Sequence, residues 1–403
     1  MTRLKNLKTI LNTRPEHKLL IACLKSHMDQ KNALDIKELL TQKIDWDYFH
    51  RIVALHGVLP IIYTNLKNIA QDSVPVKEMN HLKEQYLANV QRNLILTGEL
   101  LKIMDLFESN GIEAIPLKGP VFAESVYGSL SLRQFVDLDI LVHKSNILKV
   151  KQLFLEREYR LLAELEPVEI EKYLISQYNF HFYNTQNNIS IELHWDISSM
   201  NDHFQIDPNQ LWDDVRQVLI SGKKVLSFAP ENLLLILCIH GSRHNWKRLK
   251  WICDVAKLIQ VHQKMDWNFI IEFAKNTGSK RVLMLGVFLA FDLLGVHLPS
   301  AMIEGFRSNR PVQSLAKKIY KWQFTMIDYD IHKTPLFRIL LRERIRDRIA
   351  LLFLYSKWLL SPNEIDRSFI LLPPLLSFLY FFVRPIRLIS QYGFGFVFSL
   401  KKK

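Results

Sequence analysis

The sequence has little cysteine, and its cysteines do not form an even set of the kind that builds a disulfide framework. The 403 residues include three, Cys23, Cys238 and Cys253, with no Cys-x-x-Cys pair. This usage favours a reducing compartment and argues against a cysteine-rich zinc module. Lys and Arg also interrupt every apolar stretch of residues 1–18 before a secretory hydrophobic region could form. We therefore expect a cytoplasmic protein whose cysteines lie in its core.

A membrane-spanning segment is also lacking. The apolar run Phe369 to Val383 contains two prolines and is shorter than the ~20 residues that a spanning helix needs. Behind it come arginines, an aromatic and glycine-containing stretch at 392–398 and three lysines at 401–403. This mixture suits two arrangements: a peripheral position on an anionic inner membrane face, or packing against the protein's own helices with a solvated lysine end.

Acidic residues are much fewer than basic residues only in the C-terminal part of the chain. The chain has 53 Lys+Arg against 40 Asp+Glu and is 48% hydrophobic, which excludes a disordered protein. Residues 301–403 hold 18 basic and 7 acidic residues, whereas residues 1–300 hold 35 and 33. Because the basicity is a C-terminal property, a polynucleotide substrate is not favoured.

The hydrophobic period divides the chain into helical and mixed parts, with no internal repeat and no obvious flexible linker. Residues 16–107 have helical spacing, and helical patterns return from Pro230 onward. Between them, residues 113–117, 136–142 and 189–195 read as strands, with helices predicted over 120–127 and from Ser145 as N-cap. The fold class predicted is α+β, a small mixed sheet embedded between an α-helical N-terminal region and an α-helical C-terminal domain. The predicted divisions are 1–107, 108–200, 201–350 and 351–403.

Two aspartates lie on one face of the second predicted strand. The period of two sends the apolar residues of 136–142 to one face and Asp137 and Asp139 to the other. Carboxylates this close repel each other, and a divalent cation or a cationic partner relieves the repulsion. Their hard oxygens suit Mg²⁺, which leaves its other positions to water and substrate phosphates. Glu192, on the polar face of the third strand, joins the pair if the two strands are neighbours.

A strand-to-helix turn precedes these acids. In Leu117-Lys118-Gly119-Pro120 the glycine permits close approach of the backbone, and a helix N-terminus offers N–H groups to an anion. We interpret Lys118 and Gly119 as the phosphate-binding turn. Pro120 follows them and lacks the backbone N–H that another residue would offer to a phosphate. The alternative turn, Gly128-Ser129, leaves eight positions between Gly128 and Asp137, which is tight for a helix and a loop.

The combined pattern resembles the polymerase-β type nucleotidyltransferase superfamily, and within it the bacterial family of uncharacterised nucleotidyltransferases. The likeness spans nearly the whole chain, and its residues are Leu117-Lys118-Gly119, Tyr127-Gly128, Arg133, 137–142, 191–195, 240–246, 251–254 and the proline-interrupted C-terminus ending at 384–388. It implies a small nucleotidyltransferase-type mixed sheet among helices.

The resemblance also implies a reaction. An NMP would pass from an NTP to a hydroxyl or phosphate of an acceptor, with release of pyrophosphate. Asp137 and Asp139 would hold two Mg²⁺ ions, with Mn²⁺ as an alternative, and Glu192 would complete the coordination shell of the second ion and assist deprotonation of the acceptor. A sugar, lipid-linked or peptide acceptor is reasonable for this family, although the residues identify none.

Two other hypotheses stay open at this point. Protein or RNA nucleotidylation is the second enzymatic hypothesis. A non-catalytic module that binds a membrane face or a partner protein is the hypothesis from a different class, and Pro120 in the phosphate turn is the feature that favours it. The sequence does not indicate the oligomeric state.

Several other polar residues are candidates for the nucleotide. Arg133 either binds phosphate or neutralises the acidic edge, and Lys118 or the nearby Gly128-Ser129 could compensate for Pro120.

The helix predicted from Pro230 carries His240 and His244 on one face, with Arg243 between them. No third zinc ligand is evident, so we interpret the two histidines as a packing or hydrogen-bonding pair. Arg243, His244 and Lys247 are expected to reach the triphosphate from the helical side, and Asp254 to orient a histidine.

Overall fold

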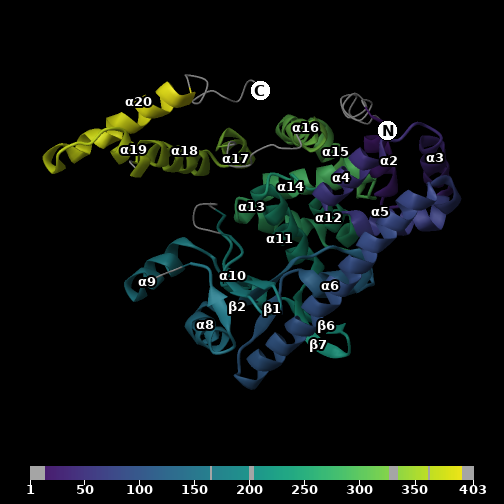
Figure 1. The fold of residues 1–403 in the computed structure, drawn as a ribbon, viewed down its shortest axis with the longest axis horizontal. Coiled ribbons are helices and arrows are strands. Elements are labelled where there is room, and N and C mark those ends of the chain that lie inside the picture. Colours follow the sequence, from purple (N-terminus) through teal and green to yellow (C-terminus); the bar gives the residue numbers. More distant parts are fainter. Residues whose placement is uncertain (1–13, 164–165, 199–203, 326–334, 362–363, 393–403) are drawn as a thin grey trace. The chain divides into compact units, whose positions relative to one another are not determined.

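The protein divides into two compact units, residues 1–329 and 330–403, in the computed structural model (Figure 1). The structure describes residues 14–163, 166–198, 204–325, 335–361 and 364–392. The first unit holds a mixed sheet among helices, which confirms the α+β class predicted from the sequence. The divisions expected at residues 107, 200 and 350 stay predictions.

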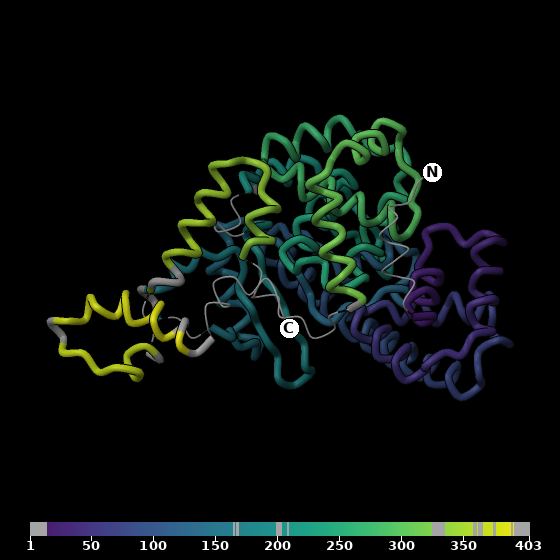
Figure 2. Tube along the Cα trace, turned by 90° about the horizontal axis from the view of Figure 1, so that it is seen from above, coloured from purple at the N-terminus to yellow at the C-terminus, as the bar shows by residue number. Residues whose placement is uncertain are grey.

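The N-terminal region is helical, as its spacing predicts. Asp29 and Asp45 begin two of its helices by accepting the N–H groups of Asn32 and Tyr48, and Gly57, at φ 66°, ends the second. Figure 2 shows these purple and blue helices beside the green helices of residues 230–325. The helices are α2 (Pro15–Cys23), α3 (Gln30–Leu40), α4 (Trp46–His56), α5 (Leu59–Ala70) and α6 (Val76–Ser109).

A five-stranded sheet of order β1-β2-β5-β4-β3 forms the middle of the first unit. The central strands β2 and β5 are parallel, and every other pair is antiparallel. The three strands predicted from the sequence are β1, β2 and β5. The strands are β1 (Ala114–Pro116), β2 (Asp137–Val142), β3 (Tyr159–Leu161), β4 (Asn179–Asn184) and β5 (Ile189–His194), and a separate hairpin, β6 (Val215–Ile220) with β7 (Lys223–Phe228), lies beside β1.

Local details differ from the sequence predictions. Strands β3, β4, β6 and β7 were not predicted. The helix expected from Ser145 begins later, because a 3₁₀ turn over Lys144–Asn146 precedes α8 (Ile147–Leu155), and its N-cap, Asn146, makes no side-chain cap. The helix predicted over 120–127 is α7 (Gly119–Phe122), which widens into a π turn over Ala123–Tyr127.

One face of the sheet is apolar and covered by α6 and α8. Leu138 and Ile191 are at most 1% exposed, and Phe107 of α6 stacks on Phe154 of α8 with ring centroids 5.7 Å apart. Burial of apolar surface stabilises a fold by about 25 cal/mol per Å². The apolar contacts in this layer therefore hold the sheet against α6 and α8. The opposite face of β2 and β5 carries the polar residues and is free to form a site.

A helical layer lies on the polar side, and a tryptophan holds it together. Trp246 is fully buried, and a Cβ atom at Gly241 or Gly286 would lie 2.5 and 2.9 Å from its ring. The two glycines are therefore needed for the ring to lie between α11 and α14. The helices of this layer are α11 (Pro230–Arg243), α12 (Leu249–Val261), α13 (Trp267–Asn276), α14 (Lys280–Leu289), α15 (Ser300–Ser308) and α16 (Arg310–Thr325), with the short α9 (Pro167–Ser176) and α10 (Pro208–Trp212) beside the sheet.

The second unit is helical in its described part. It contains α17 (Pro335–Leu341), α18 (Ile345–Leu360), α19 (Glu364–Phe369) and α20 (Tyr380–Tyr392). Across the described residues, every helix is too short or too polar to cross a membrane. The glycine and lysine end predicted to face a membrane or the protein's own body, residues 393–403, lies outside the described residues.

Candidate active site

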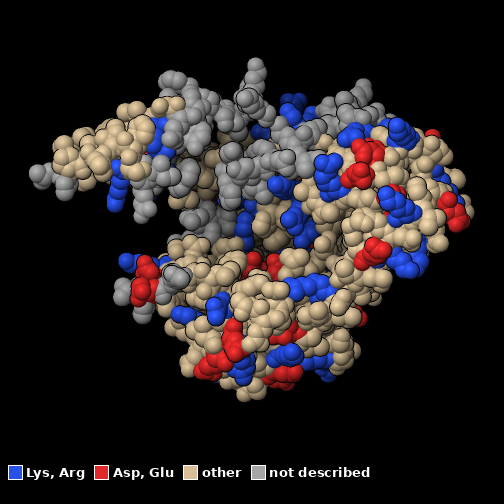
Figure 3. Space-filling view, in the orientation of Figure 1, with Lys and Arg blue, Asp and Glu red and all other residues tan. Residues whose placement is uncertain are grey.

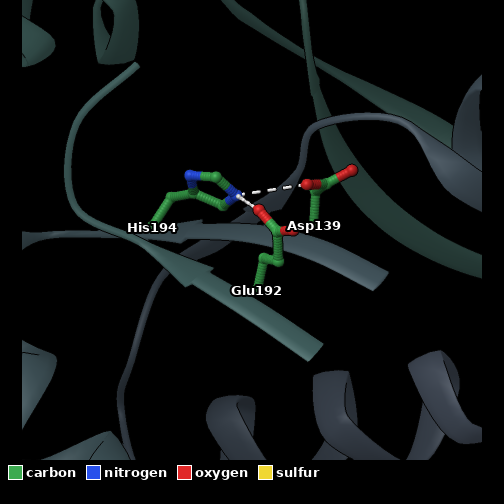
Figure 4. Close-up of side chains that lie close together, drawn as sticks. All are labelled: Asp139, Glu192 and His194. Carbon is green, nitrogen blue, oxygen red and sulfur yellow. Dashed lines mark hydrogen bonds and ion pairs between the residues drawn. The ribbon is translucent and has the colours of Figure 1, made fainter. Parts of the chain in front are cut away.

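Parallel pairing of β2 with β5 brings the predicted acids together. Asp139 and Glu192 are register partners on the polar face, so the condition that the sequence left open, that the two strands are neighbours, is met. His194, two residues further along β5, places Nε2 3.2 Å from Asp139 Oδ1 and 3.5 Å from Glu192 Oε2 (Figure 4). One ligand atom from each of the three residues lies within 4.8 Å of the others. We call these three residues the acidic cluster.

The charged groups in and around the acidic cluster shift one another's pKa values. Burial opposes ionisation of Asp139, but the charges of Lys118 and His194 hold its pKa well below the usual value. Burial likewise opposes ionisation of Glu192, and its bond with His194 lowers the pKa. Burial would lower the pKa of His194, yet its bonds to the two carboxylates raise it. The two carboxylates therefore favour the protonated form of His194.

Lys118 is fixed beside the acidic cluster. Its ammonium group lies 3.4 Å from Asp139 Oδ2 and donates to His240 Nδ1 at 2.9 Å, with only 7% of the side chain exposed. Burial and the positive charge of Lys118 keep the pKa of His240 well below its usual value, so the imidazole stays neutral and accepts this bond. His240 therefore positions the lysine.

The turn that carries Lys118 requires its glycine. Gly119 has φ +59°, a left-handed conformation that a side chain disfavours. A Cβ atom there would meet the carbonyl of Asp137 at 3.8 Å, an ordinary contact, so the backbone angle and not crowding selects glycine. The turn thereby sets Lys118 against the start of β2.

Asp137 and Lys250 are two further ionisable residues near the acidic cluster. Among the residues that the structure describes, neither side chain makes a hydrogen bond or an ion pair. Burial and the charge of Asp139 raise the pKa of Asp137. Burial and then the positive charge of Arg133 lower the pKa of Lys250 to about 8, and the charge of Asp137 acts in the opposite direction. Both groups are poised to bind an ion or a ligand of opposite charge.

Arg133 is buried and forms an ion pair inside the protein. Its Nε and Nη2 donate to the two carboxylate oxygens of Asp254, each at 2.9 Å, and the hydroxyl of Tyr127 donates to the same carboxylate at 2.9 Å. Arg133 is 7% exposed and Asp254 1%. Asp254 therefore pairs with an arginine, and the expectation that it orients a histidine is wrong.

Two further candidates from the sequence, Ser129 and Arg243, make hydrogen bonds to other parts of the protein backbone. Ser129 caps the short helix that follows it, accepting the N–H of Ser131 at 3.2 Å. Arg243 donates to the carbonyl of Ile197 at 2.6 Å and lies 4.3 Å above the ring of Tyr178.

His244 is the C-cap of α11, and Lys247 lies three residues beyond it. The ring of His244 stacks on Trp251, with centroids 4.9 Å apart, and burial together with the charge of Lys118 lowers its pKa to about 4. Lys247 follows in the next turn, where its N–H donates to the His244 carbonyl at 3.2 Å. His244 is thus close enough to Lys118 to sense its charge, and the contribution of Lys247 to nucleotide binding stays a prediction.

A pocket of about 370 Å³ opens beyond the carboxyl ends of β2 and β5. His143 and Trp212 stack in its wall with ring centroids 3.9 Å apart, and Asp196 and Gln177 also line it. Asp196 follows His194, the last residue of β5, by two residues, so this wall of the pocket lies about 7 Å along the chain from the acidic cluster. A flat aromatic wall next to a carboxylate and an amide suits a ligand with a planar or ring-shaped body and hydroxyl groups.

Sequence reasoning missed two residues of the site. His194 lies on the polar strand face, and its period-two spacing from Glu192 was the available signal. No sequence pattern pointed to Lys250, because its place near Asp137 depends on how α12 packs against the turn over Ala123–Tyr127 and the other helices.

The chain is similar to one family of known proteins. The sequence model of one family, described as uncharacterised nucleotidyltransferase, matches residues 42–295. That span contains the whole acidic cluster together with Lys118, Asp137 and Lys250. The chain has no match among curated proteins and none among solved structures.

Proposed function

The chain belongs to the uncharacterised nucleotidyltransferase family, and from this membership we propose that it transfers an NMP group from an NTP to an acceptor and releases pyrophosphate. The observation that carries the proposal is the register pairing of Asp139 with Glu192 on parallel strands, beside Asp137, whose carboxylate makes no hydrogen bond or ion pair with the described residues. A nucleotidyltransferase needs acidic residues and a phosphate-binding turn. It needs no nucleophilic side chain, because the acceptor itself attacks the phosphorus.

The residues fit a divalent cation. Two carboxylates and an imidazole converge within 4.8 Å, and Asp137 adds a carboxylate that has no partner among the described residues. Oxygen ligands of this kind suit Mg²⁺, and the nitrogen of His194 makes Mn²⁺ a further candidate. When bound by Asp139, Glu192 and His194, with Asp137 beside them on β2, the cation would neutralise triphosphate charge and polarise the reacting oxygens.

The chain's own groups have distinct roles in the proposed reaction. Lys118, held by His240, and Lys250 donate to phosphate oxygens and so orient the triphosphate. An acceptor hydroxyl attacks the α-phosphorus, the new P–O bond forms as the bond to the β-phosphate oxygen breaks, and pyrophosphate leaves. Glu192 accepts the hydroxyl proton. Arg133 supports the site indirectly, since it fixes Asp254 and Tyr127 below the acidic edge.

Calorimetric titration with non-hydrolysable analogues of the four NTPs, in the presence of Mg²⁺, tests this proposal. We expect one analogue to bind the wild type. Asp139→Asn should weaken the binding at least tenfold because it removes a cation ligand, and Lys250→Met about tenfold because it removes a charged hydrogen bond. Lys224→Met, at an exposed lysine of the β6–β7 hairpin, is the matched control and should bind like the wild type.

Two outcomes would contradict the proposal. If no analogue binds the wild type in Mg²⁺ or in Mn²⁺, the site is not a nucleotide site. If an analogue binds Asp139→Asn as tightly as the wild type, nucleotide binding occurs away from the acidic cluster.

A further inference from the structure

The C-terminal unit exposes large apolar side chains in an ordered pattern. In α18, Ile345, Ile349, Leu352 and Phe353 are 72%, 60%, 53% and 71% exposed. Their spacing of i, i+4, i+7 and i+8 puts them on one side of the helix. We call these four residues the α18 stripe. Exposed apolar patches of this kind on a folded protein mark contact surfaces.

Basic residues border the α18 stripe on both sides. At 100° per residue, Arg346 and Lys357 fall along one edge of the stripe and Arg348 along the other. The side chain of Arg346 is 59% exposed and its Nε pairs with Asp347 Oδ1 at 3.2 Å, and Lys357 is also exposed. The Nε of Arg348 donates to the carbonyl of Arg342 at 2.7 Å. The opposite side of the helix is buried, with Asp347 6% and Leu351 3% exposed. The helix therefore presents an apolar centre between two cationic margins.

The neighbouring helix keeps its arginines inside and its phenylalanines outside. Arg384 and Arg387 of α20 both donate to the carboxylate of Asp366, at 3.1 and 2.6 Å, and Asp366 is fully buried. Phe381 and Phe382 are 48% and 65% exposed. On the face drawn in Figure 3, the described surface of this unit is mainly uncharged and is interrupted by Lys and Arg.

We propose that the α18 stripe docks on an anionic lipid surface, with its apolar side chains in the interface and Arg346, Arg348 and Lys357 against the headgroups. An apolar stripe between basic margins is the pattern of helices that lie in the plane of such a surface. Residues 330–403 hold thirteen Lys and Arg against five Asp and Glu, which complements anionic lipid. Two copies paired through this stripe would bring their cationic margins together, and this repulsion disfavours a second copy as the occupant.

The inference is independent of the proposed catalysis, because the acidic cluster and its lysines belong to the other unit. Flotation of the full chain with vesicles of neutral phosphatidylcholine alone, or mixed with phosphatidylglycerol, tests it. We expect co-flotation with the anionic vesicles that 0.5 M salt reverses. The double variant Arg346→Gln with Lys357→Gln should lower the partition coefficient about fivefold for each cation removed.

The apolar contribution is tested separately. Ile349→Glu with Phe353→Glu should abolish flotation, and the milder Phe353→Ser should lower it about tenfold. Leu148→Glu, at a 55% exposed leucine of α8, is the control and should float like the wild type. Thermal unfolding at unchanged temperature verifies that each variant is folded.

Three results would overturn the inference: equal binding to neutral vesicles, no binding to anionic vesicles, or unchanged flotation of the double glutamate variant. Sedimentation velocity without lipid supplies a further check. A dimer that Phe353→Ser dissociates would assign the stripe to a second copy and also overturn the inference.

Discussion

Asp139 shows how much a single position in this site depends on partners distant in the sequence. Its carboxylate contacts Lys118, 21 residues earlier, and His194, 55 residues later. Period-two alternation predicted the face on which Asp139 lies. It could not predict these partners, because their positions depend on the strand order and on the turn at Gly119. The sequence therefore predicted the acidic residues of the site, but it did not predict which cationic groups balance their charge.

Buried neutral histidines give the first unit a dependence on pH. Burial lowers the pKa of His56 to about 3. Between pH 3 and 6.5 the unfolded chain therefore binds a proton at this residue that the folded chain does not. Its contribution to stability is complete above pH 6.5 and is lost as the pH falls, by about 2 kcal/mol between pH 7 and pH 5.

The variant His56→Asn tests this account. The amide oxygen can replace Nδ1 as acceptor for the Leu249 N–H, and the side chain does not titrate. We expect the free energy of unfolding, measured by urea denaturation, to fall less between pH 7 and pH 5 in the variant than in the wild type. An equal fall in both proteins would contradict the assigned role of His56.

At the scale of elements, the strands that carry the site were the predictable ones. β1, β2 and β5 alternate clearly or form short apolar runs, and the acidic face follows from their period. The hairpin β6–β7 has exposed residues on both faces, so its pattern carries no clear alternation. The order β1-β2-β5-β4-β3 depends on long-range pairing that no local pattern encodes. The Arg133 pair with Asp254 likewise joins residues 121 positions apart.

The turn between β1 and α7 offers a prediction with an internal control. Gly119→Ala forces a side chain into a left-handed conformation, and we expect it to lower the free energy of unfolding by about 1 kcal/mol. Gly98→Ala, in the exposed middle of α6 with nothing near its Cβ position, should raise it by about 1 kcal/mol through helix propensity. Urea denaturation measures both changes. A stabilising effect at Gly119 would show that the turn does not need its glycine.

At the scale of the whole molecule, charge and chemistry are divided between two units. The first 300 residues are close to neutral, yet they contain a local concentration of negative charge on β2 and β5. The basic excess belongs to the C-terminal part, where Arg384 and Arg387 pair with the buried Asp366, and where Arg346, Arg348 and Lys357 border the α18 stripe. The net charge of +13 is therefore compatible with a small nucleotide substrate and does not require a polynucleotide.

The most direct test of the central claim compares NTPs labelled on the α-phosphate with NTPs labelled on the γ-phosphate. Wild-type protein, Mg²⁺ and a lysate fraction are incubated with each label, in parallel with a variant that combines Asp137→Ala and Asp139→Ala. The account predicts that the wild type transfers the α label to an acceptor and releases the γ label as pyrophosphate, and that the variant does neither. Transfer of the γ label, or equal transfer by wild type and variant, would contradict it.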